Sequence, residues 1–178
     1  MNGKAADKFW NWSLKRYAYE GVEPILLKMQ DEFGFNINIA LWCCWCAENY
    51  DEAPELVIRK AIDLTGQWNT NVTTPLRSAR RYLKTSKPHG VENDALRTQI
   101  KDAERRAEMT EQSTLQQLAA DALADKPDKG DAVSGARRNL AVYTTLIGAA
   151  QKRGFTISLL EMLIDYIFIP IQKDHDKP

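Results

Sequence analysis

The feature that most constrains this chain is a stretch from residue 91 to about residue 124 that contains neither glycine nor proline. Good helix formers fill it, and one helix of about 30 residues would be ~45 Å long at the standard rise. The positions predicted to face inward recur at heptad spacing: Leu96, Ile100, Ala103, Ala107, Thr110 and Thr114. Most of them are small or polar, so we expect a thin seam and a helix that protrudes from the fold with most of its surface exposed.

Helical periodicity also dominates the rest of the chain. Strand-like alternation is missing from every stretch longer than a few residues. Residues 37–48 are apolar at almost every position, which is typical of a helix covered on all sides. Gly21 and Gly34 are suited to end the two helices before it, and Pro75 is allowed in the first turn of a helix that begins at residue 73 or 74. The sequence predicts an all-α protein, an irregular helical bundle of about seven or eight helices.

The length of 178 residues fits a single domain, residues 1–178. Within it we expect a globular helical core at residues 8–87, followed by the long helix at 91–124. Residues 125–135 are rich in Asp, Lys, Gly and Pro and predict a linker. A C-terminal helix pair at residues 136–171 should then pack back onto the core.

The charge balance restricts the classes of partner. The chain has 24 basic and 24 acidic side chains, so no overall field attracts nucleic acid or an anionic membrane. No uninterrupted apolar stretch near the N-terminus resembles a secretory signal, and none approaches the ~20 residues that span a bilayer. We expect a cytoplasmic protein without a membrane partner, and any contact with nucleic acid, the less favoured partner, must be local.

No motif predicts a catalytic residue, a metal ligand or a cofactor. Cys43 and Cys46 match C-x-x-C in spacing, but they lie within the apolar 37–48 helix, where thiols usually fill the core. A zinc site would need a further ligand, and the only histidines are His89 and His175, in a predicted loop and tail. Phosphate-binding loops and nucleophile elbows are missing. Whether the chain is an enzyme therefore stays open.

The most informative stretch is basic. No acidic residue occurs between Asp63 and Glu92, and helical spacing gathers four cations on neighbouring rows: Arg77, Arg80, Arg81 and Lys84. Guanidinium groups suit a two-pronged grip on carboxylate or phosphate. We predict a partner-binding or anion-binding site at these four residues and Trp68. Three interpretations remain open: internal pairing with the acidic segment 48–63, an acidic protein partner, or, with least weight, nucleic acid or nucleotide.

Three motifs in order resemble a family of uncharacterised proteobacterial helical proteins, a domain of unknown function. The motifs are Trp10-x-Trp12-Ser13-Leu14-x-x-Tyr17-x-x-x-Gly21-Val22, Leu26-x-x-x-Gln30-Asp31-x-x-Gly34-x-Asn36-Ile37-Asn38 and Trp68-x-x-x-Val72-x-x-Pro75-Leu76-Arg77-x-x-Arg80-Arg81-x-Leu83-Lys84. The resemblance is strongest over residues 9–87. It implies a helical fold and a bacterial origin, and it brings no catalytic residues.

Two functions follow as hypotheses. The first is a non-catalytic interaction or regulatory protein that uses the basic helix face and the long helix to bind a protein partner or a second copy of itself. The alternative is a small-molecule or anionic-ligand binding module, or an enzyme, with its site near Trp42, Trp68 and the Arg77/Arg81 row. Ligand binding and partner capture would discriminate between them.

Overall fold

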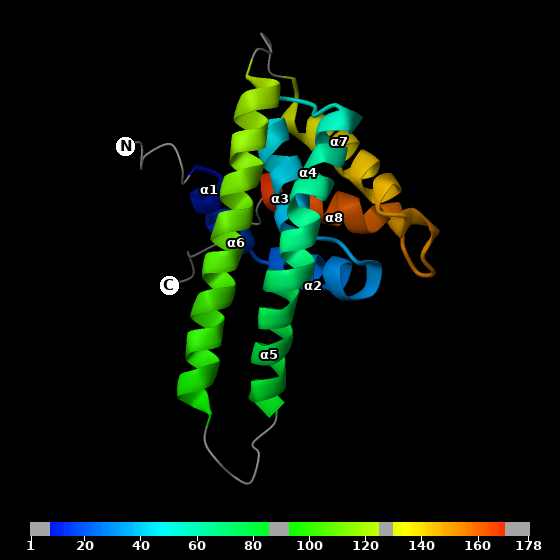
Figure 1. Ribbon diagram of the computed structural model, residues 1–178. Coiled ribbons are helices and arrows are strands. Elements are labelled where there is room, and N and C mark those ends of the chain that lie inside the picture. Colours follow the sequence, from blue (N-terminus) through cyan, green and yellow to red (C-terminus); the bar gives the residue numbers. More distant parts are fainter. Residues whose placement is uncertain (1–7, 86–92, 125–129, 170–178) are drawn as a thin grey trace, which may run out of the picture.

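The computed structural model describes residues 8–85, 93–124 and 130–169 as a bundle of α-helices (Figure 1). The helices are α1 (Lys8–Tyr17), α2 (Val22–Phe33), α3 (Ile37–Asn49), α4 (Glu55–Trp68), α5 (Thr74–Thr85), α6 (Asp94–Leu123), α7 (Ala132–Leu146) and α8 (Ile157–Phe168). No strand occurs in these ranges. The predicted all-α fold is therefore confirmed. Within the same ranges, none of the helices is long and apolar enough to cross a membrane.

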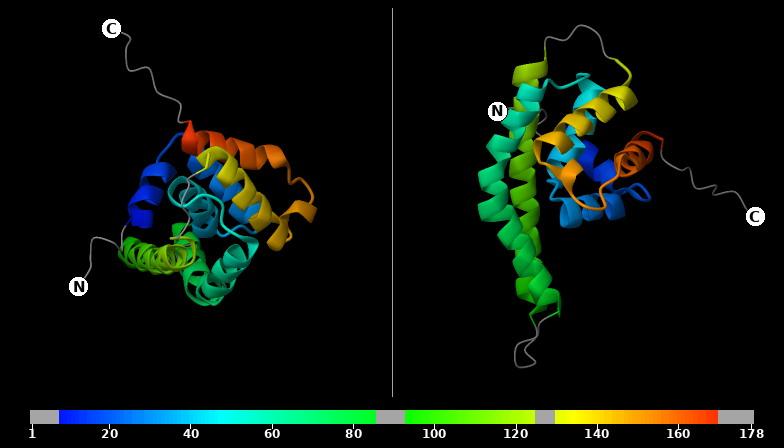
Figure 2. Two further views of the ribbon diagram at one scale, coloured as in Figure 1. Left: turned by 90° about the horizontal axis from the view of Figure 1, so that it is seen from above. Right: turned by 90° about the vertical axis from the view of Figure 1, so that its right-hand side faces the viewer.

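Helix α3 lies in the middle of the bundle (Figure 2) and is buried from Asn38 to Ala47. Its indole Trp42 donates a hydrogen bond from Nε1 to the carbonyl oxygen of Leu115 in α6, at 2.8 Å. On the other side, the Asn139 amide of α7 donates to the carbonyl oxygen of Cys43 at 3.0 Å. The apolar run of residues 37–48 thus forms the central core helix, as its pattern predicts.

The three cysteines belong to this core. Cys43, Cys44 and Cys46 are fully buried and unpaired by disulfides. Burial raises the pKa of all three thiols, which disfavours the reactive thiolate. They pack as small apolar side chains.

Helices α4 and α5 form one continuous path through a π-helical turn, Asn69–Thr73. The Thr74 amide donates to the Asn69 carbonyl oxygen, five residues back, instead of four. Pro75 follows at once; it has no N–H, and its ring would crowd a regular turn before it. The predicted helix start at residue 73 or 74 is confirmed by α5, and the wider turn connects α5 to α4 without a break.

The long helix is confirmed as α6, but its predicted inward face is wrong. Of the six heptad positions only Ala107 is buried, and the Thr110 and Thr114 hydroxyls donate back to their own helix. The buried residues are Glu104, Ala107, Glu111, Gln112, Leu115, Leu118, Ala119 and Leu123. The buried positions still recur every seven residues, as at Glu104, Glu111 and Leu118, but they lie one residue later than the predicted face, where side chains of α1, α3 and α5 pair with the polar residues of α6.

Helix α6 also does not protrude alone. Its first turns run beside the end of α5, and the two helices project together as a hairpin (Figure 1). From Glu104 onward α6 covers the core. The projecting part is therefore short and two helices thick.

At the C-terminal side, α7 begins at Ala132, within the predicted linker 125–135. The Asp131 side chain accepts a hydrogen bond from the Ser134 amide at 2.9 Å and caps the helix there. Residues 125–129 lie outside the described part of the chain. Helix α7 packs along α3, and α8 packs against α2 and α7.

The register of α6 can be tested with two neighbouring positions. Replacing buried Leu115 by alanine should lower the free energy of unfolding by about 2–5 kcal/mol, because it leaves a cavity against the core. Replacing the exposed Thr114 by alanine should change it by less than about 0.5 kcal/mol. Urea denaturation followed by circular dichroism measures both. Similar losses at the two positions would contradict this register.

Candidate functional site

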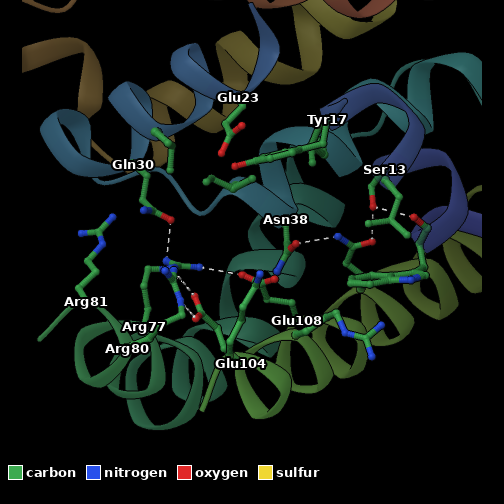
Figure 3. A pocket seen from close by; sticks show the side chains of 18 residues that line it. Ser13, Tyr17, Glu23, Gln30, Asn38, Arg77, Arg80, Arg81, Glu104 and Glu108 are labelled. Atoms are coloured by element: carbon green, nitrogen blue, oxygen red, sulfur yellow. Dashed lines mark hydrogen bonds and ion pairs between the residues drawn. The ribbon is translucent and has the colours of Figure 1, made fainter. Parts of the chain in front are cut away.

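A hollow of about 400 Å³ opens between α1, α2, α3, α5 and α6 (Figure 3). Part of its wall is apolar and consists of Trp10, Leu14, Leu27, Ile37 and Leu41. The ionisable lining residues are Tyr17, Glu23, Arg77, Arg80, Arg81, Lys101, Glu104, Arg105 and Glu108. We call this hollow the central pocket. Its size lies within the roughly 300–1,000 Å³ of small-molecule sites.

A chain of buried polar side chains lies along one side of the pocket. Ser13 donates to the amide oxygen of Gln112 at 2.9 Å, and the Gln112 amide donates to Asn38 at 2.8 Å. The Asn38 amide in turn donates to the Glu111 carboxylate at 3.2 Å. Because each of these buried groups has a hydrogen-bond partner, this network of side chains fixes α1, α3 and α6 relative to one another.

Helix α5 is held against α6 by charge. None of its residues is fully buried. Glu104, only 8 % exposed in its side chain, accepts from Arg77 at 3.3 Å and from both Nε and Nη2 of Arg80. Arg77 also donates to Glu108 at 3.0 Å and to Gln30 of α2 at 2.6 Å. The two arginines thereby neutralise the pocket's buried acid.

Two further pocket groups have shifted pKa values. Burial, with smaller effects from Glu23 and Glu108, raises the pKa of Tyr17 to about 12, so its hydroxyl stays protonated at neutral pH. Burial also raises the pKa of Glu108, although the Arg77 guanidinium opposes that shift. Perturbed groups in a pocket are typical of functional sites.

The predicted basic site is only partly assembled. Arg77, Arg80 and Arg81 line the central pocket, and Arg81 pairs with Asp31 on the exposed side at 3.1 Å. Lys84 is exposed, lies outside the pocket and pairs with no acid in the described ranges. Internal pairing does occur, but the acids come from α6 and α2; the segment 48–63 supplies none. The sequence alone could not identify which helix supplies the acids that pair with α5.

The tryptophans proposed for the alternative site lie elsewhere. Trp42 is fully buried in the core. Trp68 donates from its Nε1 to the carbonyl oxygen of Ala107 at 3.0 Å and fastens α4 to α6. Neither lines the central pocket. The aromatic wall comes from Trp10 and Tyr17 of α1 instead.

Sequence reasoning missed Lys101 and Arg105. Both line the pocket, and neither forms an ion pair or hydrogen bond with a described residue. A signal was present: Lys101 and Arg105 lie four residues apart, as do Glu104 and Glu108, so two rows of opposite charge run side by side on α6. Acidic and basic residues mixed along a helix are otherwise typical of a solvated face.

The described residues offer no group of three or more His, Cys, Asp and Glu that could hold a metal ion. Arg77 and Arg81 do border a second hollow of about 330 Å³, beside the π-helical turn, together with Asn69, Thr74 and Ser78. Its walls carry amide and hydroxyl groups. Chemistry in either hollow would therefore depend on arginine, lysine, carboxylate, amide and hydroxyl groups.

The model of one protein family, described as "Protein of unknown function (DUF2390)", matches residues 8–115. The chain belongs to this family. No curated protein and no solved structure matches the chain. The DUF2390 region runs from the start of α1 to Leu115 in α6, so it contains every residue that lines the central pocket, from Trp10 to Gln112. Helices α7 and α8 lie beyond it.

The raised pKa of Glu108 and the lowered pKa of Asp31 predict opposite effects of pH. A hydrogen bond from Gln30 and the neighbouring Arg81 lower the pKa of the Asp31 carboxyl below its usual 3.8, whereas burial raises that of Glu108 above 4.5. The contribution of Glu108 to stability is complete at low pH and is lost as pH rises through its folded pKa. The contribution of Asp31 to stability is present at neutral pH and is lost as pH falls through the folded-state pKa of Asp31.

Urea denaturation at about pH 3 and about pH 7 tests this pair, provided that the fold persists at the lower pH. Relative to the unmodified protein, Glu108→Gln should gain stability as pH rises, and Asp31→Asn should lose it. A loss of stability for Glu108→Gln as pH rises would show that the pocket does not bury Glu108 as described.

Proposed function

We propose that this DUF2390 protein is a non-catalytic binding module whose central pocket holds a small organic anion. The observation that carries the proposal is the pair Lys101 and Arg105, which line the pocket without an acidic partner among the described residues. Arg77 and Arg80 are already neutralised by Glu104 and Glu108. The cations available to a ligand are thus the two on α6.

The local energetics of α6 support an anion there. Like charges four residues apart on a helix repel each other by about 0.2–0.5 kcal/mol. For Glu104 and Glu108 this repulsion is offset by direct ion pairs with the arginines of α5, whereas Lys101 and Arg105 form no ion pair with a described residue. An anion bound between Lys101 and Arg105 would relieve their mutual repulsion. Local conflicts that a fold leaves uncompensated are expected at functional positions.

The apolar wall supports a ligand with a hydrocarbon part. Leu14 is 52 % exposed although it lines the pocket, and the hydrocarbon part of a bound ligand would cover it. Burying apolar surface contributes roughly 25 cal/mol per Å². The pocket thus combines a charged grip with apolar contact, as small-molecule sites do.

A protein partner remains the second candidate, at a different surface. Tyr82 is 62 % exposed and Leu96 50 % exposed, at the paired ends of α5 and α6 that project from the bundle. Large apolar side chains there favour docking of a protein or of a second copy of this chain. The Arg77 and Arg80 side chains contribute less to such docking, because their charges are used internally. The cytoplasm stays the predicted location.

Thermal unfolding of the full chain with a panel of aliphatic carboxylates and alkyl phosphates tests the binding function. A ligand at a hundred times its Kd should stabilise the fold by about 2.7 kcal/mol. The double variant Lys101→Gln/Arg105→Gln should lose most of this stabilisation, because it removes both free cations. Unfolding without ligand should be unchanged or occur at slightly higher temperature.

The matched control is Arg106→Gln, on the same helix but outside the pocket lining. It removes one positive charge and should leave the ligand effect intact. The proposal fails if no anion of the panel stabilises the protein. It also fails if Arg106→Gln reduces the effect as much as the pocket variant, since binding would then follow overall charge.

A further inference from the structure

The charges of the central pocket are divided between two sides. Tyr17 of α1 and Glu23 of α2 lie together on one side in Figure 3, while Glu104 and Glu108 extend from α6 on the opposite side. Lys101 and Arg105 each precede one of those glutamates by three residues and so share their face of α6. The side of the pocket that carries Glu23 is therefore acidic, and the unpaired charges on the opposite side, Lys101 and Arg105, are basic.

The acidic side is available to a ligand. Glu23 is exposed and forms no ion pair with a described residue. The Tyr17 hydroxyl lies beside its carboxylate (Figure 3), and Glu23 is one of the groups that keep this hydroxyl protonated. A protonated hydroxyl that donates to a carboxylate still has oxygen lone pairs for a second donor. An ammonium group, which only donates, fits between these two oxygens.

The centre of the pocket offers no free charge of either sign. Arg77 is taken up by Glu104, Glu108 and Gln30. Leu27, Ile37 and Leu41 add apolar lining from α2 and α3. A ligand that reaches from the acidic to the basic side would therefore meet apolar lining as well as charged groups.

We propose that the ligand is a zwitterion, with an ammonium group at Glu23 and Tyr17, an anionic group at Lys101 and Arg105, and a short apolar chain between them. This inference rests on the proposed function and goes further, because it names the second charge of the ligand. An anion without the ammonium group would leave Glu23 unused. A cation without an anionic group would leave the charges of Lys101 and Arg105 unpaired.

Isothermal titration of the full chain with two homologous series tests the proposal. One series is the straight-chain ω-amino acids with roughly two to eight methylene groups, and the other is the alkanoic acids of the same lengths. The amino acids should bind at least about tenfold more tightly at the best length, as expected for a hydrogen bond to a charged group. Affinity should peak at one length, because both ends must reach their partners.

Variants separate the two ends of the ligand. Glu23→Gln should remove the tenfold advantage of the amino acids and leave the alkanoic acids unchanged, and Tyr17→Phe should reduce it. The control Glu32→Gln lies on the same helix outside the pocket and should change neither series. Lys101→Gln/Arg105→Gln should weaken both series.

The outcomes are distinguishable. Equal affinity for the two series overturns the zwitterion and leaves the anion pocket in place. A Glu23→Gln variant that weakens both series alike also overturns it, since Glu23 would then act on the fold or on the anion. No binding of either series to the unmodified protein overturns the anion pocket and the zwitterion together.

Discussion

The fold around the pocket depends on one buried carboxylate. Glu104 lies at the α5–α6 contact with two guanidinium groups on its two oxygens. A carboxylate so deeply buried is costly unless it is paired and hydrogen-bonded, and removing one partner of such a pair typically costs about 3–5 kcal/mol. None of the apolar side chains of α5 is fully buried; Leu76 and Leu83 are half-buried. The position of α5 on α6, and with it one wall of the pocket, is set by this charge cluster.

That cluster also determines which charges remain for function. A row of arginines on an acid-free helix has the appearance of a docking surface, but Arg77 and Arg80 complete the fold instead. Their pairing leaves Lys101, Arg105 and Glu23 as the pocket charges without an ion pair in the described ranges. The strongest charge pattern in the sequence thus serves the structure, and weaker, scattered charges line the free part of the pocket.

The helices themselves follow from local sequence. The apolar run at residues 37–48 and the stretch without glycine or proline before residue 124 predict α3 and α6 because helix formation depends on near neighbours. The buried face of α6 could not be predicted in the same way. Glu104, Glu111 and Gln112 are polar, and they are buried because partners on α1, α3 and α5 satisfy them. Such pairing joins residues far apart in sequence, and the spacing of apolar residues along one helix cannot predict it.

The same limit applies to the pocket. Arg77, Arg80 and Arg81 could be found because they cluster on one helix. Tyr17 and Glu23 come from other helices, and nothing in their local sequence links them to α6. Pro75 correctly indicates the first turn of α5, but it does not indicate the π-helical turn that connects α5 to α4.

The most direct test of this account is a double-mutant cycle on Arg80 and Glu104, with each residue replaced by alanine singly and together. The free energy of unfolding from urea denaturation gives the coupling between the two side chains. A buried, hydrogen-bonded pair predicts a favourable coupling of about 1–3 kcal/mol, with the double variant less unstable than the sum of the single variants. A coupling near zero would mean that Glu104 does not hold α5 to α6, and the account of the pocket would be wrong.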